Sequence, residues 1–270
     1  MTVRDAAKYM MDADPLPFVL QILSKWGSFS LKRAENGIDS IEDLVELALG
    51  WKFIPSNFTD LFSVKPYQVR EEIVELLSII RTMRPRRILE IGTCTGGTLY
   101  LFARIAPPDA VIFSIDLPYG PFGGGYPKWK IPLLTSFARH NQRIHLFRDD
   151  SHDPRVVENV RQRLQDNPLD FLFIDGDHTY EGVKKDFEMY SPLVRPGGVI
   201  ALHDIARSPR FPKAKVNEFW TETRQLYRHQ EIIHDPNQGY CGIGLIFWNP
   251  DVNRSRAPLN SWGEPRVMRP

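Results

Sequence analysis

Two carboxylates and an imidazole stand where a buried apolar run ends. The stretch FIDGDHTYEGVKKDF places Asp175, Asp177 and His178 after the apolar run 171–174 and before a segment whose apolar positions have helical spacing. Ionised groups at the end of a buried strand are costly unless they have partners. An imidazole, with an ordinary pKa of about 6.5, can accept a proton at neutral pH. The pattern therefore predicts proton-transfer chemistry, with His178 as the base and Asp175 beside it.

The same residues also allow structural interpretations. Asp177 can cap the helix that starts near residues 179–181, and His178 can hydrogen-bond the backbone at the strand end. The other histidines show no ligand spacing, so we assign them structural roles: His140, His145, His152, His229 and His234.

A second acid follows the next apolar run, in the stretch IALHDI. If the two runs form adjacent parallel strands, Asp204 lies close to Asp175. Two neighbouring carboxylates repel each other and need a cation or a shared proton. A divalent metal bound through oxygen ligands is one solution, while His203 can either join it or donate to a carboxylate.

A nucleotide-type pattern precedes these acids. In ILEIGTCTGGTLY, residues 88–100, a strand ends near Glu90 and a glycine loop leads into a helix, whose free N–H groups can meet anionic oxygens. Asp116 follows about 20 residues after the loop, where an acid can bind both ribose hydroxyls. Asp150 and Ser151 follow a third strand and can meet an adenine edge. Turn and helix-capping roles remain open at all of these positions.

The elements that position these residues alternate along the chain. Strands are predicted at 86–92, 110–116, 143–150, 170–175 and 197–205, and helices at 66–83, 97–106, 130–140, 153–164 and 180–190. Strands that are apolar throughout and alternate with helices predict an α/β fold with a doubly wound parallel sheet. A helix over 213–227 and a hairpin of strands 229–235 and 240–248 follow, so the last strand is antiparallel.

Three parts are expected from this pattern. Residues 1–65 form an N-terminal helical cap, in which Ser40 and Asp43 resemble a capping box, residues 66–249 form the α/β domain, and residues 250–270 form a flexible tail. The loop 116–130 is rich in glycine, proline and aromatic residues. It is either a surface loop with its own small cluster or a lid formed by four aromatic residues: Tyr119, Phe122, Tyr126 and Trp129. The N-terminal helices are candidate contacts of a homodimer.

Composition excludes several classes of protein. The 270 residues are 42% apolar and 25% charged with a net charge of +1, so no global field favours nucleic acid or membrane surfaces. We see no signal peptide, no membrane-spanning run and no basic stripe with interleaved aromatics. The two cysteines, Cys94 and Cys241, form no metal-type pair, which favours a reduced, cytoplasmic protein.

Taken together, the residues between Arg86 and Trp248 resemble a class I S-adenosylmethionine-dependent methyltransferase. The resemblance implies a Rossmann-like, seven-stranded, mostly parallel sheet whose last strand is antiparallel. It also implies cofactor contacts, which involve the following residues: Glu90, Gly92, Thr93 and Gly96 for the methionine part, Asp116 for the ribose, Asp150 and Ser151 for adenine, and Asp175 near the methyl group. Cys94 departs from the pattern, since many members have glycine there.

The stretches IDGDHTYE and LVRPGGVIALHDI are similar to those of metal-dependent small-molecule and sugar O-methyltransferases and of the cephalosporin-hydroxylase-like group. This implies transfer of a methyl group to a hydroxyl of a sugar, phenol or other secondary metabolite. It also implies Asp175, His203 and Asp204 as ligands of a divalent metal, Mg²⁺ or Mn²⁺. Competing interpretations are a nicotinamide-dependent oxidoreductase and a non-catalytic domain that keeps the cofactor fold.

Overall fold

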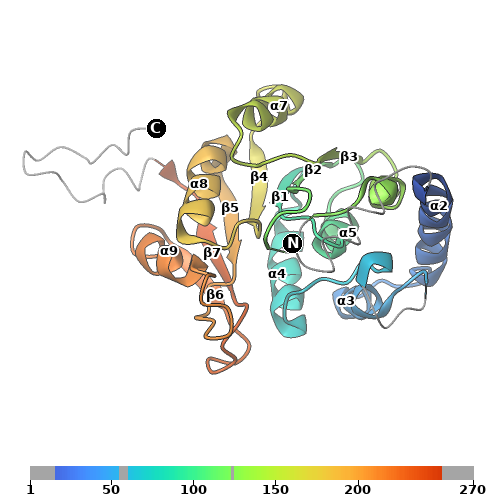
Figure 1. Cartoon of the computed structure of the whole chain (residues 1–270). Coiled ribbons are helices and arrows are strands. Elements are labelled where there is room, and N and C mark those ends of the chain that lie inside the picture. Colours follow the sequence, from blue (N-terminus) through green and yellow to red (C-terminus); the bar gives the residue numbers. More distant parts are fainter. Residues whose placement is uncertain (1–15, 55–59, 123–124, 251–270) are drawn as a thin grey trace, which may run out of the picture.

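A seven-stranded sheet runs through the molecule (Figure 1). The computed structural model describes residues 16–54, 60–122 and 125–250. Its strands are β1 Arg87–Ile91, β2 Val111–Ile115, β3 Arg143–Phe147, β4 Leu169–Ile174, β5 Val194–His203, β6 His229–Ile232 and β7 Ile243–Phe247. They lie in the order β3-β2-β1-β4-β5-β7-β6.

Strands β1 to β5 are parallel, and β7 pairs antiparallel with both β5 and β6. The predicted doubly wound sheet with an antiparallel last strand is therefore confirmed. The strand order reverses direction between β1 and β4, and ligands of such sheets bind at this point, beyond the carboxyl ends of the strands.

Helices cover both faces of the sheet (Figure 1). They are α2 Leu16–Ala34, α3 Ile41–Gly50, α4 Arg70–Met83, α5 Gly97–Ile105, α6 Ile131–Thr135, α7 Pro154–Leu164, α8 Tyr180–Tyr190 and α9 Val216–Thr223, with 3-10 turns at Asp60–Phe62, Lys128–Lys130 and Ser191–Leu193. One hydrophobic core joins one sheet face to α3, α4 and α5, and a second joins the other face to α7, α8 and α9. Because both faces are buried, the central strands are apolar nearly throughout.

Local sequence signals place several helix ends. The Ser40 side chain accepts a hydrogen bond from the Asp43 backbone N–H at 3.0 Å, so α3 begins at the predicted cap. Asp153 caps α7 in the same way, followed by Pro154 at the first helical position.

Two predicted helices are shorter than expected. The segment 130–140 forms only α6, because the hydroxyls of Thr135 and Ser136 donate to the preceding carbonyls of Ile131 and Leu133 and the chain then turns. The segment 213–227 forms α9 only from Val216, since the N–H of Lys215 instead donates to the His178 carbonyl at 2.7 Å. This bond ties the start of α9 to the turn between β4 and α8.

None of the helices in the described residues is long and apolar enough to cross a membrane. Residues 1–15 of the expected cap and residues 251–270 of the expected tail lie outside the described part of the chain. The division of the chain at residues 65 and 249 stays a prediction.

Candidate active site

Two glycines shape the loop after β1. Gly92 has φ +100°, and a Cβ there would lie 2.0 Å from the Asp175 carbonyl oxygen. Only glycine therefore lets the ends of β1 and β4 approach this closely. Gly96, with φ +89°, precedes α5, and a Cβ there would lie 2.3 Å from the Leu134 side chain. The loop is thus fixed by close packing as well as by backbone conformation.

Cys94 stands in this loop at the position where the resemblance predicts glycine. Its φ of +47° lies in the left-handed region, which non-glycine residues rarely adopt. Its backbone N–H donates a hydrogen bond to the Asp116 carboxylate at the end of β2. The acid predicted to meet a ribose is therefore held against the glycine loop.

A cleft of about 190 Å³ opens beyond the carboxyl ends of the strands. Five of the predicted cofactor residues line it: Gly92, Asp116, Asp150, Ser151 and Asp175. Ligand pockets usually enclose roughly 300–1,000 Å³. The cleft is smaller than this, and Leu117, Gly120, Pro121 and Phe122 form one of its walls.

Glu90, Thr93 and Gly96 are not among the residues that line this cleft. Glu90 is fully buried below the glycine loop, where its carboxyl group accepts hydrogen bonds from Ser114, at 2.6 Å, and from Thr98. Thr93 also bonds Ser114, at 2.5 Å. Burial raises the pKa of Glu90 to about 8, although the two hydroxyls oppose the shift. These residues support the loop from below.

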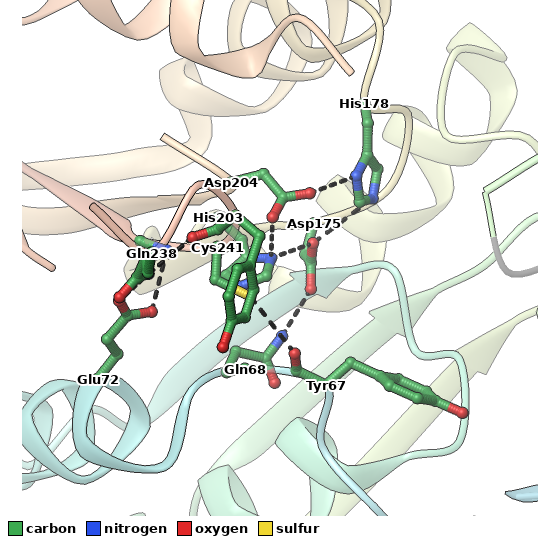
Figure 2. A network of polar contacts seen from close by, with 11 residues as sticks. Tyr67, Gln68, Glu72, Asp175, His178, His203, Asp204, Gln238 and Cys241 are labelled. Carbon is green, nitrogen blue, oxygen red and sulfur yellow. Dashed lines mark hydrogen bonds and ion pairs between the residues drawn. The ribbon is translucent and has the colours of Figure 1, made fainter. Parts of the chain in front are cut away.

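His178 lies between the two acids that follow strands β4 and β5 (Figure 2). Its Nδ1 is 2.6 Å from Asp204 Oδ2, and its Nε2 is 3.6 Å from Asp175 Oδ1. The structure thus brings together the three residues that the sequence pattern predicted as neighbours. Asp204 has φ +61°, an unfavourable conformation of the kind found at functional sites.

Two further side chains hold Asp175 from the opposite side (Figure 2). His203 Nδ1 is 2.9 Å from Asp175 Oδ1 and 3.5 Å from Asp204 Oδ1, so this histidine contacts both carboxylates. The Gln68 side-chain amide donates to Asp175 Oδ2 at 2.8 Å. The Asp175 carboxylate is therefore held on both oxygens, by His203 and by the Gln68 amide, which restricts its rotation.

Burial and charge act in opposite directions on this cluster. Burial lowers the pKa of both imidazoles, but Asp204 and Asp175 offset this, so the pKa of His178 is raised and that of His203 is raised well above the ordinary 6.5. Burial raises the pKa of Asp204, but the neighbouring His203 and His178 lower it by more. The net result is a pKa well below the ordinary value. The two imidazoles therefore favour the ionised form of Asp204.

The same cluster offers donor atoms for a divalent cation. Ligand atoms of Asp175, His178 and Asp204 lie within 4.8 Å of one another, and His203, Asp204 and Cys241 form a second such group. His203 Nε2 is buried without a hydrogen-bond partner. Carboxylates combined with imidazole suit Mn²⁺, Fe²⁺ or Zn²⁺ better than Mg²⁺. The residues therefore fit a metal of that kind.

The aromatic loop contributes one side chain to this site. The ring of Phe122 stacks on the imidazole of His178, with centroids 5.0 Å apart and planes 10° apart. Tyr126 and Trp129, which we also predicted for a lid, are instead buried, and Trp129 packs in a small core with Leu20. Residues 123 and 124 of this loop lie outside the described part of the chain.

Sequence reasoning missed two residues of the site, Gln68 and Cys241, whereas Phe122 was among the predicted lid residues. Gln68 precedes α4 and is 107 positions from its partner Asp175, a contact that no local pattern could reveal. Cys241 reaches the cluster from the turn between β6 and β7, where Glu72 accepts the Gly242 N–H at 2.9 Å and fixes this turn. For Phe122 the only signal was the aromatic content of its loop.

Comparison with known proteins agrees with this arrangement. Residues 89–205 match a family model described as a methyltransferase domain. A caffeoyl-CoA O-methyltransferase of Populus kitakamiensis is 26% identical over 126 residues, which cover 47% of this chain and 49% of that protein. A mycinamicin VI 2''-O-methyltransferase of Micromonospora griseorubida is 25% identical over 179 residues, covering 59% of this chain and 40% of that protein.

Among solved structures, the O-methyltransferase TomG from Streptomyces achromogenes, in complex with SAM, has the same fold. Its TM-score is 0.51 at 20% identity, and the match covers 83% of this chain and 97% of TomG. The match to a methyltransferase-domain model over residues 89–205 and the fold shared with TomG agree with the resemblance to class I S-adenosylmethionine-dependent methyltransferases. The chain spans half or less of the length of the first curated relatives that it matches.

Proposed function

We propose that this protein transfers the methyl group of S-adenosylmethionine to a hydroxyl group of a small molecule. The observation that supports this most directly is the position of His178. It lies beside the cleft with one ring nitrogen on Asp204, 2.6 Å away, and the other facing Asp175. A histidine held in this way by a carboxylate is typical of a general base.

The cofactor roles follow from the residues that line the cleft. Asp116 would bind the ribose hydroxyls, Asp150 and Ser151 the adenine, and Gly92 would allow close approach of the methionine part. Bound S-adenosylmethionine supplies a methyl group that is already activated. The protein therefore has mainly to position the acceptor and remove its proton.

We infer that proton removal uses the two nitrogens of His178 differently. In its neutral form Nε2 accepts the proton of the acceptor hydroxyl. Asp204 keeps the ring oriented through Nδ1 and stabilises the imidazolium that results. Asp175, held by His203 and Gln68, would orient the hydroxyl.

A divalent metal would be held by Asp175, Asp204 and His203, the ligands that the resemblance implies. Such an ion lowers the pKa of a bound hydroxyl. In this assignment the imidazole ligand is His203, although His178 also lies within ligand distance of both acids, and His178 keeps the role of base.

The acceptor in this proposal is a sugar or a phenol. Two relatives bear names that refer to small molecules, caffeoyl-CoA and mycinamicin VI. Phe122, next to His178, offers an aromatic surface on which a ring can pack.

We also propose a homodimer formed through the N-terminal helical cap. Four large apolar residues of α2 are exposed with the alternating spacing of three and four that two-helix seams use: Val19, Ile22, Trp26 and Phe29. A second copy of α2 supplies the same seam by symmetry. Light scattering should find a dimer for the wild type and a monomer for Trp26→Glu combined with Phe29→Glu.

A cytoplasmic location is proposed because Cys94 and Cys241 form no disulfide.

Incubation with S-adenosylmethionine and a panel of catechols and methyl glycosides tests the main proposal. We expect acceptor-dependent formation of S-adenosylhomocysteine and a methylated product, detected by mass spectrometry. The reactions are run with EDTA, Mg²⁺ or Mn²⁺, and Asp175→Asn serves as the matched variant with reduced turnover. Product that forms equally well in Asp175→Asn and in the wild type would contradict the assigned site.

A further inference from the structure

A basic segment, residues 205–215, follows directly after Asp204. It contains four cationic residues and no acid, although the whole chain has a net charge of only +1. The four are Arg207, Arg210, Lys213 and Lys215. Lys215 pairs with Glu218, while the other three are exposed and form no ion pair with any residue that the structure describes. Positive charge without a protein partner is therefore concentrated in this segment.

Both ends of the basic segment are tied to the site. At its start the N–H of Ala206 donates to the Cys241 carbonyl at 2.9 Å, and at its end the N–H of Lys215 donates to the His178 carbonyl at 2.7 Å. Arg207 is three residues from Asp204, a span of at most roughly 10–11 Å. The segment therefore holds its cations close to the proposed base.

The acids of the site have other partners. Asp204 contacts His178 at 2.6 Å and His203 at 3.5 Å. Asp175 contacts His203 at 2.9 Å and accepts a hydrogen bond from Gln68 at 2.8 Å. The cations of the basic segment are therefore not needed to compensate these two carboxylates by direct contact, and they can bind an anionic ligand.

The cofactor cleft carries the opposite charge. Four acids line it, and no lysine or arginine in the described part of the chain does so: Asp116, Asp150, Asp175 and Asp177 are the acids. This lining suits the positive sulfonium of S-adenosylmethionine and repels an acidic group. The charges thus favour a cationic cofactor on one side of the site and an anionic acceptor at the basic segment.

The basic segment also presents an aromatic surface. Phe211, in the middle of the segment, is 64% exposed. The segment lies against the turn between β6 and β7, where a Cβ on Gly239 would be 3.6 Å from Pro209, and the neighbouring Tyr240 is 44% exposed. Aromatic rings beside cations suit a ligand that joins a ring to an acidic group.

We propose that the acceptor carries an acidic group, a carboxylate or a phosphate, which Arg207, Arg210 and Lys213 bind while the acceptor hydroxyl lies at His178. The inference rests on the proposed function, because it takes methyl transfer at His178 as the reaction. Guanidinium groups bind both kinds of oxyanion through paired N–H donors. The acidic group takes no part in bond making or breaking, so the basic segment selects and positions the acceptor.

Calorimetric titration of matched acidic and neutral compounds, with S-adenosylhomocysteine at saturation, tests this role. The pairs are methyl glucuronide with methyl glucoside, 3,4-dihydroxybenzoate with catechol, and glucose 6-phosphate with glucose. We expect the wild type to bind the acidic member of at least one pair at least about tenfold more tightly, as expected for hydrogen bonds to a charged group. High salt should reduce this preference. The pair with the largest preference distinguishes a carboxylate from a phosphate.

Charge reversal in the basic segment should remove the preference. Arg207→Glu combined with Arg210→Glu should bind the acidic and neutral members within about threefold of each other, because the paired donors are lost. The matched control, Arg139→Glu combined with Arg143→Glu, makes the same change in net charge at exposed positions near the edge strand β3 and should keep the preference. Affinity for S-adenosylhomocysteine, measured for both variants, reports that each one is folded.

Two results would overturn the proposal: no acidic compound binds the wild type more tightly than its neutral partner, or the control variant loses the preference as well. Either result leaves the proposed function intact, since a neutral sugar or phenol can still be methylated. A wild type that binds no S-adenosylhomocysteine and methylates no acceptor would overturn the proposed function itself, and with it the reaction on which this inference depends.

Discussion

A buried acid before the glycine loop, Glu90, and a half-buried acid after β5, Asp204, have pKa values shifted in opposite directions. Glu90 is surrounded by the hydroxyls of Ser114 and Thr98, and burial raises its pKa to about 8. Burial also raises the pKa of Asp204, but His203 and His178 lower it to well below its ordinary value. Both side chains lose hydration, so the difference comes from their partners. Neutral donors leave a buried carboxyl protonated, and cationic partners keep it ionised.

The carboxyl ends of the strands in this sheet therefore differ in charge and packing. The end of β1 is neutral and tightly packed, as the close approach of Gly92 to the Asp175 carbonyl illustrates. The ends of β4 and β5 carry two acids and two imidazoles in mutual contact. The end of β1 is suited to hold the methionine part of the cofactor, and the ends of β4 and β5 are suited to transfer a proton.

Replacement of the proposed base, His178, should have the largest effect on the rate of methyl transfer. His178→Ala removes the proposed proton acceptor, so methyl transfer should fall by roughly 10²–10⁴-fold. Because His178 is not among the residues lining the cleft, affinity for S-adenosylhomocysteine should change little. The two quantities are measured by product formation and by calorimetry. Full turnover in this variant would remove His178 from the mechanism.

The raised pKa of Glu90 should affect how the free energy of unfolding depends on pH. Folded Glu90 holds its proton up to a pH of about 8, whereas the ordinary value in an unfolded chain is 4.5. Between these values the folded state binds more protons, so its contribution to stability falls by about 1.4 kcal/mol per pH unit as the pH rises. Glu90→Gln mimics the protonated form and lacks this loss.

Urea unfolding at pH 5, 6.5 and 8 measures the prediction for Glu90. The free energy of unfolding of Glu90→Gln should gain on that of the wild type with each step in pH, by a few kcal/mol in total. A difference that stays constant over this range would mean that Glu90 is already ionised in the folded protein.

The acids beside His178 should affect how the rate of methyl transfer depends on pH. His178 must be neutral to accept a proton, and Asp204 and Asp175 raise its pKa above 6.5. Turnover should therefore rise up to tenfold per pH unit and level off above pH 6.5. In Asp204→Asn the midpoint should move to lower pH. A profile that levels off below pH 6.5 in the wild type would contradict the raised pKa.

Gln68 should give the smallest effect. Gln68→Leu removes the 2.8 Å hydrogen bond to Asp175 Oδ2 but leaves the contact with His203. The loss of one hydrogen bond to a charged group costs about 1.5–3 kcal/mol, which corresponds to a fall in kcat/KM of roughly tenfold to a hundredfold. Gln230→Leu, at a half-buried position of β6, removes an amide hydrogen bond to the Glu75 carboxylate instead and serves as the control. Unchanged kcat/KM in Gln68→Leu would show that His203 alone fixes Asp175.

The sequence was sufficient for the sheet and for the meeting of Asp175, His178 and Asp204. Apolar runs that alternate with helical segments require a parallel sheet, and the carboxyl ends of adjacent parallel strands lie at one edge. The contacts of Gln68 and Phe122 could not be predicted, since they depend on how segments far apart in sequence pack. His152 was predicted to be structural because it shows no ligand spacing in the sequence. Its contact with Asp186, on the following strand–helix unit, could not be predicted for the same reason.

The protonation of Glu90 was likewise beyond the sequence, because it depends on complete burial and on two hydroxyls from other elements. The same limit applies to helix lengths. The ends of α6 and α9 depend on hydroxyl groups and on a backbone bond to His178 that periodicity does not report.

Binding of S-adenosylhomocysteine by calorimetry tests the central claim most directly. The titration compares the wild type with Asp116→Asn, and NADH is titrated in parallel. We predict a dissociation constant on the order of micromolar for the wild type, weaker binding by Asp116→Asn and no heat from NADH. Binding of NADH without binding of S-adenosylhomocysteine would contradict the account and point to an oxidoreductase. An absence of binding by both would point to a domain that keeps the fold without the cofactor.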